Sequence, residues 1–414
     1  MATPSYAPEL TGVGRYAGEL ARGLVARGYQ VEVVTTPPHY PGWYVRAPYR
    51  ATRYCTEMLD GVRVYRCPIF IPKRASGLYR LLSTLSFGLS ASPLLLWRIL
   101  RTRPDVVLCV EPTLALAPAA LTAARLAGAA TALHVQDIEL DAALSVGHLN
   151  LPKPVLKAAF GLDRFIRRRF DRLITISTTM AQTLVRKGVA ADRVDILRNW
   201  VNTDQIRPLD GPNPYRAELG IAADERVCLY SGQIGRKQAL DLVLEAAEAL
   251  VGDRRFRFVI AGDGPELPAL KQRFGHLPNV LFLPLQPEER LCEFLNLADV
   301  HVLPQHAGVS ELVLPSKLGG MLASGRPILV TADTESELAQ FLGDAAVIVP
   351  PGDAARVVDG LLEMTHRPDT GKDQRVALAR SISAVASLDA FDRSLRALRA
   401  PPATGKVALP RSDA

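Results

Sequence analysis

The sequence has little of what marks disulfide-rich, metal-binding or exported proteins. Its 414 residues include only five cysteines, an odd number with no CxxC pair, at positions 55, 67, 109, 228 and 292. This usage argues against a disulfide framework or a cysteine-based zinc site, and it favours a reducing compartment. The N-terminus, MATPSYAPEL, has no basic segment followed by an apolar one, so we expect no secretory signal peptide.

The composition is that of a globular protein, with 48% hydrophobic and 22% charged residues. At about 150 residues per domain, the length indicates two or three domains. The net charge of +7 is unevenly distributed, since residues 1–205 carry 26 basic and 15 acidic residues and the remainder carries 23 and 27. A basic first half suits a polyanionic partner. No nucleic-acid-binding signature accompanies it, which leaves anionic lipid or a phosphorylated substrate as the better candidates.

Short β-branched runs alternate with amphipathic helical patterns along the chain, which is typical of parallel α/β domains. The rhythm breaks at a Pro/Gly-rich stretch, 209–220, and then restarts. We therefore predict two doubly wound domains, 1–205 and 206–385, then a helix, 386–400, that packs back toward the first, and a disordered tail, 401–414. The expected strands are 31–36, 62–67, 105–110, 130–135 and 172–177, then 226–232, 256–264, 279–284, 299–304 and 327–332.

One expected strand is missing. The chain opens with a loop, TPSYAPELTGVG, that leads directly into the helical pattern GRYAGELARGLVARG. In a doubly wound domain a central strand precedes this loop. Either the start of the chain is assigned too late or the protein has lost a core strand.

One segment has a membrane-like composition, and a second supports contact with a membrane surface. Segment 77–104 is the most apolar, but Pro93, several serines and Arg98 interrupt it, and it falls short of the roughly 20 apolar residues that a span needs. It is a buried or interfacial helix, or a helix on a membrane surface. Segment 153–172 places Lys and Arg beside Leu, Phe and Ile, as an interfacial helix does. A solvated basic face is the alternative.

Two glycine loops precede helices, where free N–H groups and the helix dipole favour anions. Gly12 and Gly14 form the first, for which a simple tight loop is the alternative. In the second domain Gly232 follows a strand, and Arg236 and Lys237 come just before a helix. The spacing is not that of an ATPase P-loop, but these cations can neutralise a diphosphate.

Further polar residues stand at strand ends. His134 and Asp137 follow a strand of the first domain, where open α/β sheets bind ligands, and a histidine there can transfer a proton or donate to a hydroxyl. Glu311, Ser316 and Lys317 surround a turn before a helix of the second domain. A carboxylate there can accept hydrogen bonds from sugar or ribose hydroxyls. A structural histidine and a solvated glutamate are the alternatives.

Taken together and in order, these pieces resemble the family-4 retaining glycosyltransferases of the GT-B fold, over about residues 4–395. Within that family the chain looks most like the branch of colanic-acid fucosyltransferases and O-antigen N-acetyl-L-fucosamine transferases. The motifs that carry the resemblance are PxxGVG, DGVRVYRCP, RFDRLITISTTMAQTLVRKGV, ILRNWVNTDQIRPL, YSGQIGRKQALDLVLEAA, FVIAGDGPE and LPSKLGGMLASGRPILVT.

The resemblance implies transfer of a sugar, with retention and without a metal or other cofactor, from a nucleoside diphosphate donor to a lipid-linked or saccharide acceptor. The donor sugar is expected to be a deoxyhexose such as fucose or N-acetylfucosamine, bound in an interdomain cleft. The implied catalytic residues are His134, Lys237 and Glu311. The implied donor-binding residues are Gly12, Gly14, Gly232, Arg236, Lys237, Glu311, Ser316 and Lys317, and the acceptor-side residues are His134 and Asp137.

The sequence departs from the family pattern at positions that bind the nucleotide. Gly320 stands where the broad family has a second, ribose-binding glutamate, and Glu311 lies one position off the strict spacing. Gln233 stands where the phosphate-binding arginine is usual, and Arg236 is a possible substitute. Asn202 replaces a usual aspartate. These departures leave the base and the ribose contacts open.

We therefore expect a hexosyltransferase-type enzyme of exopolysaccharide or O-antigen synthesis. Its partners would be a nucleotide sugar, a polyprenyl-diphosphate-linked or saccharide acceptor and an anionic membrane, with no nucleic acid. It would be cytoplasmic and peripheral on the inner face of the plasma membrane. A non-catalytic subunit of a polysaccharide complex and a sugar-nucleotide epimerase remain as alternatives.

Overall fold

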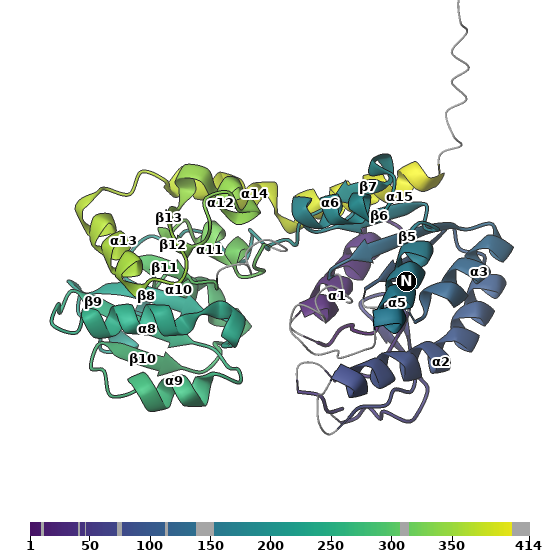
Figure 1. Ribbon diagram of the computed structural model, residues 1–414, viewed down its shortest axis with the longest axis horizontal. Helices are drawn as coiled ribbons and strands as arrows, with labels where there is room; N and C mark the ends of the chain where they lie inside the picture. Colours follow the sequence, from purple (N-terminus) through teal and green to yellow (C-terminus); the bar gives the residue numbers. More distant parts are fainter. Residues whose placement is uncertain are drawn as a thin grey trace, which may run out of the picture. The chain divides into compact units, whose positions relative to one another are not determined.

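The computed structural model describes residues 1–9, 12–39, 42–45, 47–72, 77–111, 115–137, 153–306 and 314–399. The chain forms two compact units (Figure 1). The first unit comprises residues 1–175 and 181–197 and the chain from Leu388 onward, and the second comprises 176–180 and 198–387. The chain crosses into the second unit at Arg198 and returns to the first at Leu388. Glu311 and the tail after Arg399 lie outside the described residues.

The second unit is built on one six-stranded parallel sheet, in the order β10-β9-β8-β11-β12-β13. Its strands are buried on both faces, so they read as nearly continuous apolar runs. They are β8 (Arg226–Ser231), β9 (Phe256–Ala261), β10 (Val280–Leu283), β11 (Val300–Leu303), β12 (Ile328–Thr331) and β13 (Val347–Val349).

Helices follow these strands and cover the sheet, which is the doubly wound arrangement that the alternating pattern predicts. They are α7 (Pro214–Glu218), α8 (Leu240–Ala249), α9 (Leu267–Phe274), α10 (Leu291–Leu295), α11 (Leu318–Ser324), α12 (Glu337–Leu342), α13 (Ala354–His366) and α14 (Lys372–Ser381). Three short 3₁₀ turns join them: η2 (Arg236–Gln238), η3 (Glu288–Arg290) and η4 (Gly343–Ala345).

The first unit contains two groups of strands, ordered β1-β3-β2 and β4-β5-β6-β7. Of the described strands of this unit, β2 alone runs antiparallel to its neighbour. The strands are β1 (Glu32–Thr35), β2 (Cys55–Leu59), β3 (Val62–Arg66), β4 (Val106–Val110), β5 (Ala130–Val135), β6 (Arg172–Thr175) and β7 (Val194–Ile196).

The place of the missing central strand is partly filled. Ala2 bridges to Val34 of β1 and to Cys109 of β4, in parallel on both sides. Its amide donates to the Leu108 carbonyl at 2.8 Å, and its carbonyl accepts from the Val110 amide at 2.9 Å. The described residues before α1 hold no full strand, as the sequence indicated. These bridges nevertheless join the two strand groups into one sheet.

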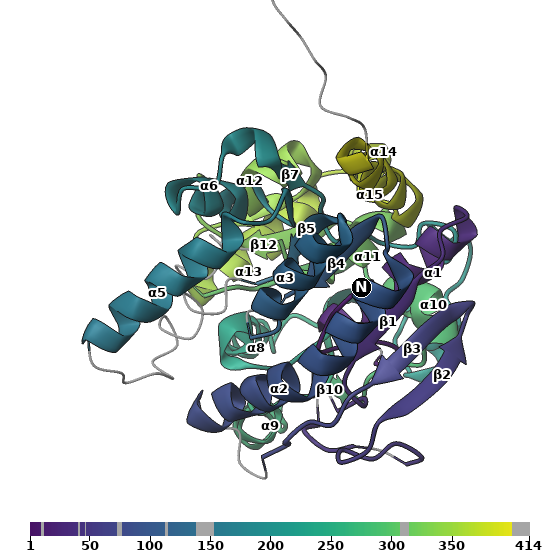
Figure 2. The ribbon, with the colours of Figure 1, turned by 90° about the vertical axis from the view of Figure 1, so that its right-hand side faces the viewer.

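The helices that lie wholly or mostly in the first unit are α1 (Gly12–Ala26), α2 (Gly77–Thr102), α3 (Ala117–Ala127), α5 (Lys153–Arg167), α6 (Thr178–Arg186) and α15 (Ala384–Arg399), with a 3₁₀ turn, η1 (Ala191–Arg193). Helices α2, α3 and α5 connect successive strands along the sheet in the same direction. Right-handed crossovers therefore place these three on one face of the sheet (Figure 2). Helix α15 packs beside α1, where Tyr29 donates to Asp392 at 2.5 Å.

A buried ionic cluster fixes α5 to the sheet. Arg167 of α5 is fully buried and lies 2.9 Å from a carboxylate oxygen of Glu111, which follows β4, and 2.5 Å from Asp163 on its own helix. Lys187 adds a 3.5 Å contact to Asp163. Burial raises the pKa of Glu111 to about 7, although Arg167 acts in the opposite direction. The cluster therefore depends on the guanidinium to offset two buried carboxylates.

We predict that Arg167→Met lowers the free energy of unfolding of the first unit by roughly 3–5 kcal/mol, because it leaves buried carboxylates without their cation. Denaturant unfolding followed by hydrogen exchange of α5 measures the loss. Arg164→Met, an exposed change on the same helix, is the matched control and should change stability by less than about 0.5 kcal/mol. Equal stability of the two variants would contradict the assigned role of the cluster.

Candidate donor-binding site

The glycine loop after β8 is held against the loop after β9 by backbone contacts. The Ile234 amide donates to the Asp263 carbonyl at 2.8 Å. A Cβ on Gly262 would lie 1.8 Å from the Gly232 carbonyl oxygen, and Gly262 has a φ of +156°. Only glycine therefore permits the two loops to approach this closely. Their contact fixes the backbone of Gly232 at the carboxyl end of the sheet, where ligands of doubly wound domains bind.

The two cations predicted from the sequence lie on the turn that continues this loop. Arg236 and Lys237 both lie in η2, and both side chains are exposed. Neither has an ion pair with a carboxylate in the described part of the chain. Helix α8 follows, and its N-cap residue Ala239 makes no side-chain hydrogen bond to the helix. The backbone N–H groups at the start of α8 therefore receive no side-chain cap and can donate to a bound anion.

Lys317 is brought against this loop from the other side of the site. Its ammonium lies 3.7 Å from the centroid of the Tyr230 ring, and a Cβ on Gly232 would lie 3.6 Å from the same nitrogen. The nitrogen is buried and has no hydrogen-bond partner among the described residues. Desolvation lowers the pKa of Lys317 to about 7. The sequence predicted Lys317 for this site, but not that its charge would be buried on an aromatic ring.

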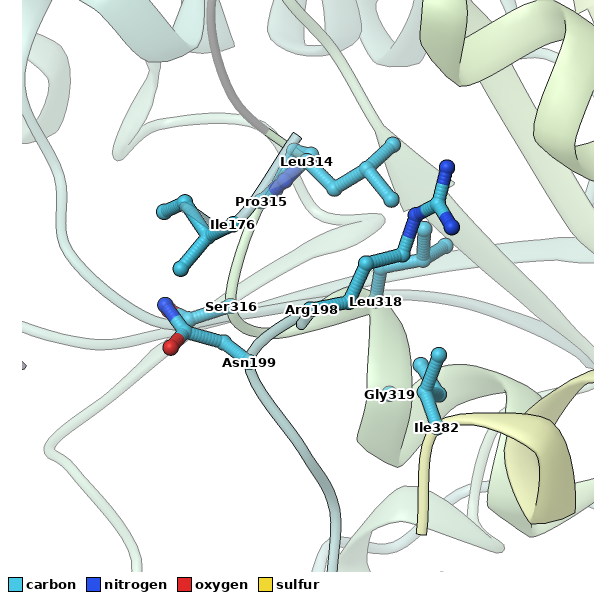
Figure 3. A pocket seen from close by; sticks show the side chains of 9 residues that line it. All are labelled: Ile176, Arg198, Asn199, Leu314, Pro315, Ser316, Leu318, Gly319 and Ile382. Carbon is cyan, nitrogen blue, oxygen red and sulfur yellow. The ribbon is translucent and has the colours of Figure 1, made fainter. Parts of the chain in front are cut away.

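A pocket opens beside Ser316 within the second unit (Figure 3). Its walls come from the turn that contains Pro315 and Ser316, and from Asn199, whose side-chain oxygen is buried with no hydrogen-bond partner in the described residues. The remaining lining residues are Ile176, Arg198, Leu314, Leu318, Gly319 and Ile382. The pocket is therefore mostly apolar, with polar groups from Ser316, Asn199 and Arg198 at its edge.

Gly320 faces away from these polar groups. A Cβ there would lie 3.0 Å from Leu295 and 3.7 Å from Ile206, both core residues. An acidic side chain would therefore start toward an apolar surface. This position offers no carboxylate for a ribose, which agrees with the departure seen in the sequence.

The first glycine loop, at the start of α1, is occupied by an acidic side chain. A Cβ on Gly14 would lie 2.5 Å from a carboxylate oxygen of Glu9. Glu9 is 5% exposed and accepts from the His39 amide at 3.0 Å. Gly14 thus has a packing reason to be glycine, and the nearby carboxylate disfavours a phosphate at this point. Gly12 has a φ of +63°, which glycine adopts without strain. Sequence reasoning missed Glu9 because no spacing motif marks it.

His134, predicted on the acceptor side, is a buried residue. It is 2% exposed, its ring packs edge-on against Phe391 of α15 with centroids 5.0 Å apart, and its Nε2 lies 3.0 Å from the Gln136 amide nitrogen. Desolvation lowers the pKa of His134 to about 3. The ring therefore stays neutral at physiological pH. Asp137, two residues beyond β5, is exposed.

The chain matches two protein-family models in succession. The first, described as a glycosyl transferase 4-like domain, matches residues 11–200. The second, described as glycosyl transferases group 1, matches residues 225–367. A putative colanic acid biosynthesis glycosyl transferase, WcaI of Escherichia coli K12, is 36% identical over 403 residues, which cover 95% of this chain and 98% of the relative.

Solved structures share the fold of the chain at low identity. Sucrose-phosphate synthase from Thermosynechococcus elongatus superposes with a TM-score of 0.70 at 14% identity, over 96% of this chain and 98% of that one. Anabaena HepE in complex with UDP-glucose superposes with a TM-score of 0.64 at 14% identity, over 96% of this chain and all of that one. These likenesses establish the GT-B architecture.

The neutral state of His134 gives a prediction about acid stability. A histidine with a pKa of about 3 when folded and about 6.5 when unfolded makes unfolding easier as the pH falls below 6.5, because only the unfolded chain takes up the proton. Between pH 6 and 4 we expect this residue to reduce stability by roughly 1.4 kcal/mol per pH unit. His134→Gln should flatten that part of the curve measured by denaturant unfolding.

His276→Gln, at an exposed position, is the control and should leave the slope unchanged. A His134 titration midpoint between pH 6 and 7, followed by NMR of its ring, would contradict the burial of the residue.

Proposed function

Because the chain belongs to the glycosyltransferase family that carries a glycosyl transferase 4-like domain followed by a group 1 domain, we propose that it transfers a sugar from a nucleoside diphosphate to a lipid-linked or saccharide acceptor. The relative named for colanic acid biosynthesis supports a role in exopolysaccharide or O-antigen assembly. The HepE complex with UDP-glucose supports a nucleotide sugar as donor. A deoxyhexose such as fucose or N-acetylfucosamine remains our proposal for the transferred sugar.

The observation that carries the proposal is the buried ammonium of Lys317 beside Gly232. Burying a cation without an anion is costly, and the fold lowers the pKa of this group instead of supplying a carboxylate from the described residues. A diphosphate at Gly232 would supply the absent negative charge. Arg236 and Lys237 would hold its outer oxygens, and the uncapped start of α8 would add its dipole.

In the proposed reaction the bond from the sugar to the diphosphate breaks while the acceptor hydroxyl attacks from the same side, which retains the configuration. The negative charge that develops on the leaving diphosphate is stabilised by Lys237, Arg236 and Lys317. The acceptor proton passes to a leaving phosphate oxygen. Since side-chain cations supply the neutralisation, we propose that the transfer requires no metal, and it should proceed undiminished in the presence of EDTA.

We predict that Lys237→Ala lowers turnover by at least about 10²-fold, which is the scale of losing one electrostatic contact to a developing charge. Release of UDP or GDP from the sugar nucleotide that the wild-type chain consumes measures the effect. Lys271→Ala, at an exposed lysine of α9, is the control and should keep wild-type turnover. Near-wild-type turnover of Lys237→Ala would remove this residue from the mechanism.

Lys317 predicts a pH dependence of nucleotide binding. Its pKa of about 7 in the free protein means that Lys317 is mostly neutral above pH 7 and must take up a proton when the diphosphate binds. The affinity for UDP or GDP should therefore fall as the pH rises from 7 to 9, by up to about tenfold per unit, while proton uptake accompanies binding. Calorimetry in buffers of different ionisation enthalpy measures both.

Lys317→Met should bind the same nucleotide at least about tenfold more weakly at pH 7, without proton uptake and with a flat pH profile. A wild-type profile in this variant would contradict the role of Lys317, whereas binding of neither nucleotide by the wild-type chain would contradict the donor class.

A further inference from the structure

Helix α2 presents an apolar stripe to solvent along most of its length. Five large hydrophobic side chains of this stripe are 42–79% exposed, with Leu89 the most exposed at 79%: Leu82, Leu85, Leu89, Trp97 and Leu100. Their spacing of three, four, eight and three residues keeps them on one side of the helix. At 1.5 Å per residue the stripe is about 27 Å long.

The opposite side of α2 is the one that holds the helix to the protein. Phe87, Ala91, Leu95 and Ile99 are buried at a four-residue spacing. The helix is therefore apolar on both sides, and among the described residues its inner side is the one packed against the protein. No described helix is long and apolar enough to cross a bilayer. The exposed stripe is thus long and continuous enough to lie against an apolar partner.

Helix α5 repeats the arrangement on the same face of the sheet. Val155, Leu162 and Phe165 are 47%, 58% and 53% exposed, and they follow one another at helical spacing. The guanidinium of Arg169 lies 3.3 Å from the centroid of the Phe165 ring. The buried cluster around Arg167 occupies the inner side of this helix. Helices α2 and α5, which lie on either side of α3, therefore both expose apolar side chains next to basic ones.

The charged residues beside these stripes are mostly basic. Helices α2, α3 and α5 together contain eight basic residues and one acidic one, and of the basic ones Arg167 is buried and Arg98 pairs with Glu32 of β1. The acidic residue, Asp163, is buried and paired with Arg167. At the end of α2, the Arg98 and Arg101 guanidinium groups lie 5.2 and 5.8 Å from the Trp97 ring centroid. A partner that covers this face should therefore offer an apolar layer to the exposed stripe and negative charges to the basic residues beside it.

We propose that the outer faces of α2 and α5 lie in the headgroup region of an anionic lipid bilayer, parallel to its plane. A bilayer with anionic headgroups offers an apolar layer below a negative surface, which matches both the stripes and the basic residues. A second copy of the chain matches less well, because two such faces would bring like charges together. The exposed side chains and their charges are the evidence for this proposal. It is connected to the proposed function only because a membrane is where a lipid-linked acceptor would lie.

The test is sedimentation of the full chain with vesicles of phosphatidylethanolamine and phosphatidylglycerol at 3:1, compared with pure phosphatidylcholine. We expect binding to the anionic vesicles only, with the partition coefficient reduced at least about tenfold by the double substitution Leu85→Gln and Leu89→Gln. The matched control is Val251→Gln with Leu285→Gln, a pair that is 44% and 57% exposed in the second unit and should bind as the wild type does.

Each outcome can be assigned. Absence of binding to anionic vesicles by the wild-type chain, or equal binding by the two double variants, would overturn the proposal. A lipid-free dimer that the α2 substitutions dissociate, seen by analytical ultracentrifugation, would identify a second copy as the occupant. UDP or GDP binding by the α2 variant, checked by calorimetry, shows that the variant is folded and keeps this test separate from that of the donor site.

Discussion

A buried ammonium that has no counterion among the described residues is the constraint from which our account of the donor site follows. Lys317 ends on the face of Tyr230, beside Gly232, and the described residues offer it no acceptor. The ring supplies some stabilisation through its quadrupole, but the lowered pKa shows that the charge is still disfavoured there. Such a group gains most from a bound anion. On this basis we propose that the phosphates of a donor bind beside Lys317.

The remaining features of the site serve to present this cation to a ligand. The glycines after β9 permit the backbone contact that fixes the loop after β8, and that loop leads into η2 with its two exposed cations. In the first unit the corresponding glycine turn contacts the Glu9 carboxylate. His134 of this unit packs against Phe391 of α15. The two units thus have opposite local charge at their glycine loops, which supports assigning the diphosphate to the second.

The sequence predicted the strand framework because parallel strands buried on both faces are short apolar runs separated by helical patterns. All ten expected strands are confirmed, but β2, β7 and β13 were not predicted, since they are short or, as in β2, half-exposed. The pairing of Ala2 could not be predicted, because the segment around it is too short to show the alternation of apolar and polar residues that marks a strand. Nor could the burial of His134, since its ring partner Phe391 lies on a helix at the other end of the chain. The positions of Gly232 and Lys317 beside one another agree with the family resemblance, whereas the contact with Tyr230 depends on tertiary packing alone.

We propose that the loop after β8 and the turn before α11 together bind a nucleoside diphosphate. Hydrogen exchange of the full chain with and without saturating UDP, and separately GDP, tests it most directly. With one of the two nucleotides, the account predicts slower exchange at amides 232–239 and 315–318, and no comparable change around Gly14. Unchanged exchange in both segments with both nucleotides, from a folded chain, would contradict it.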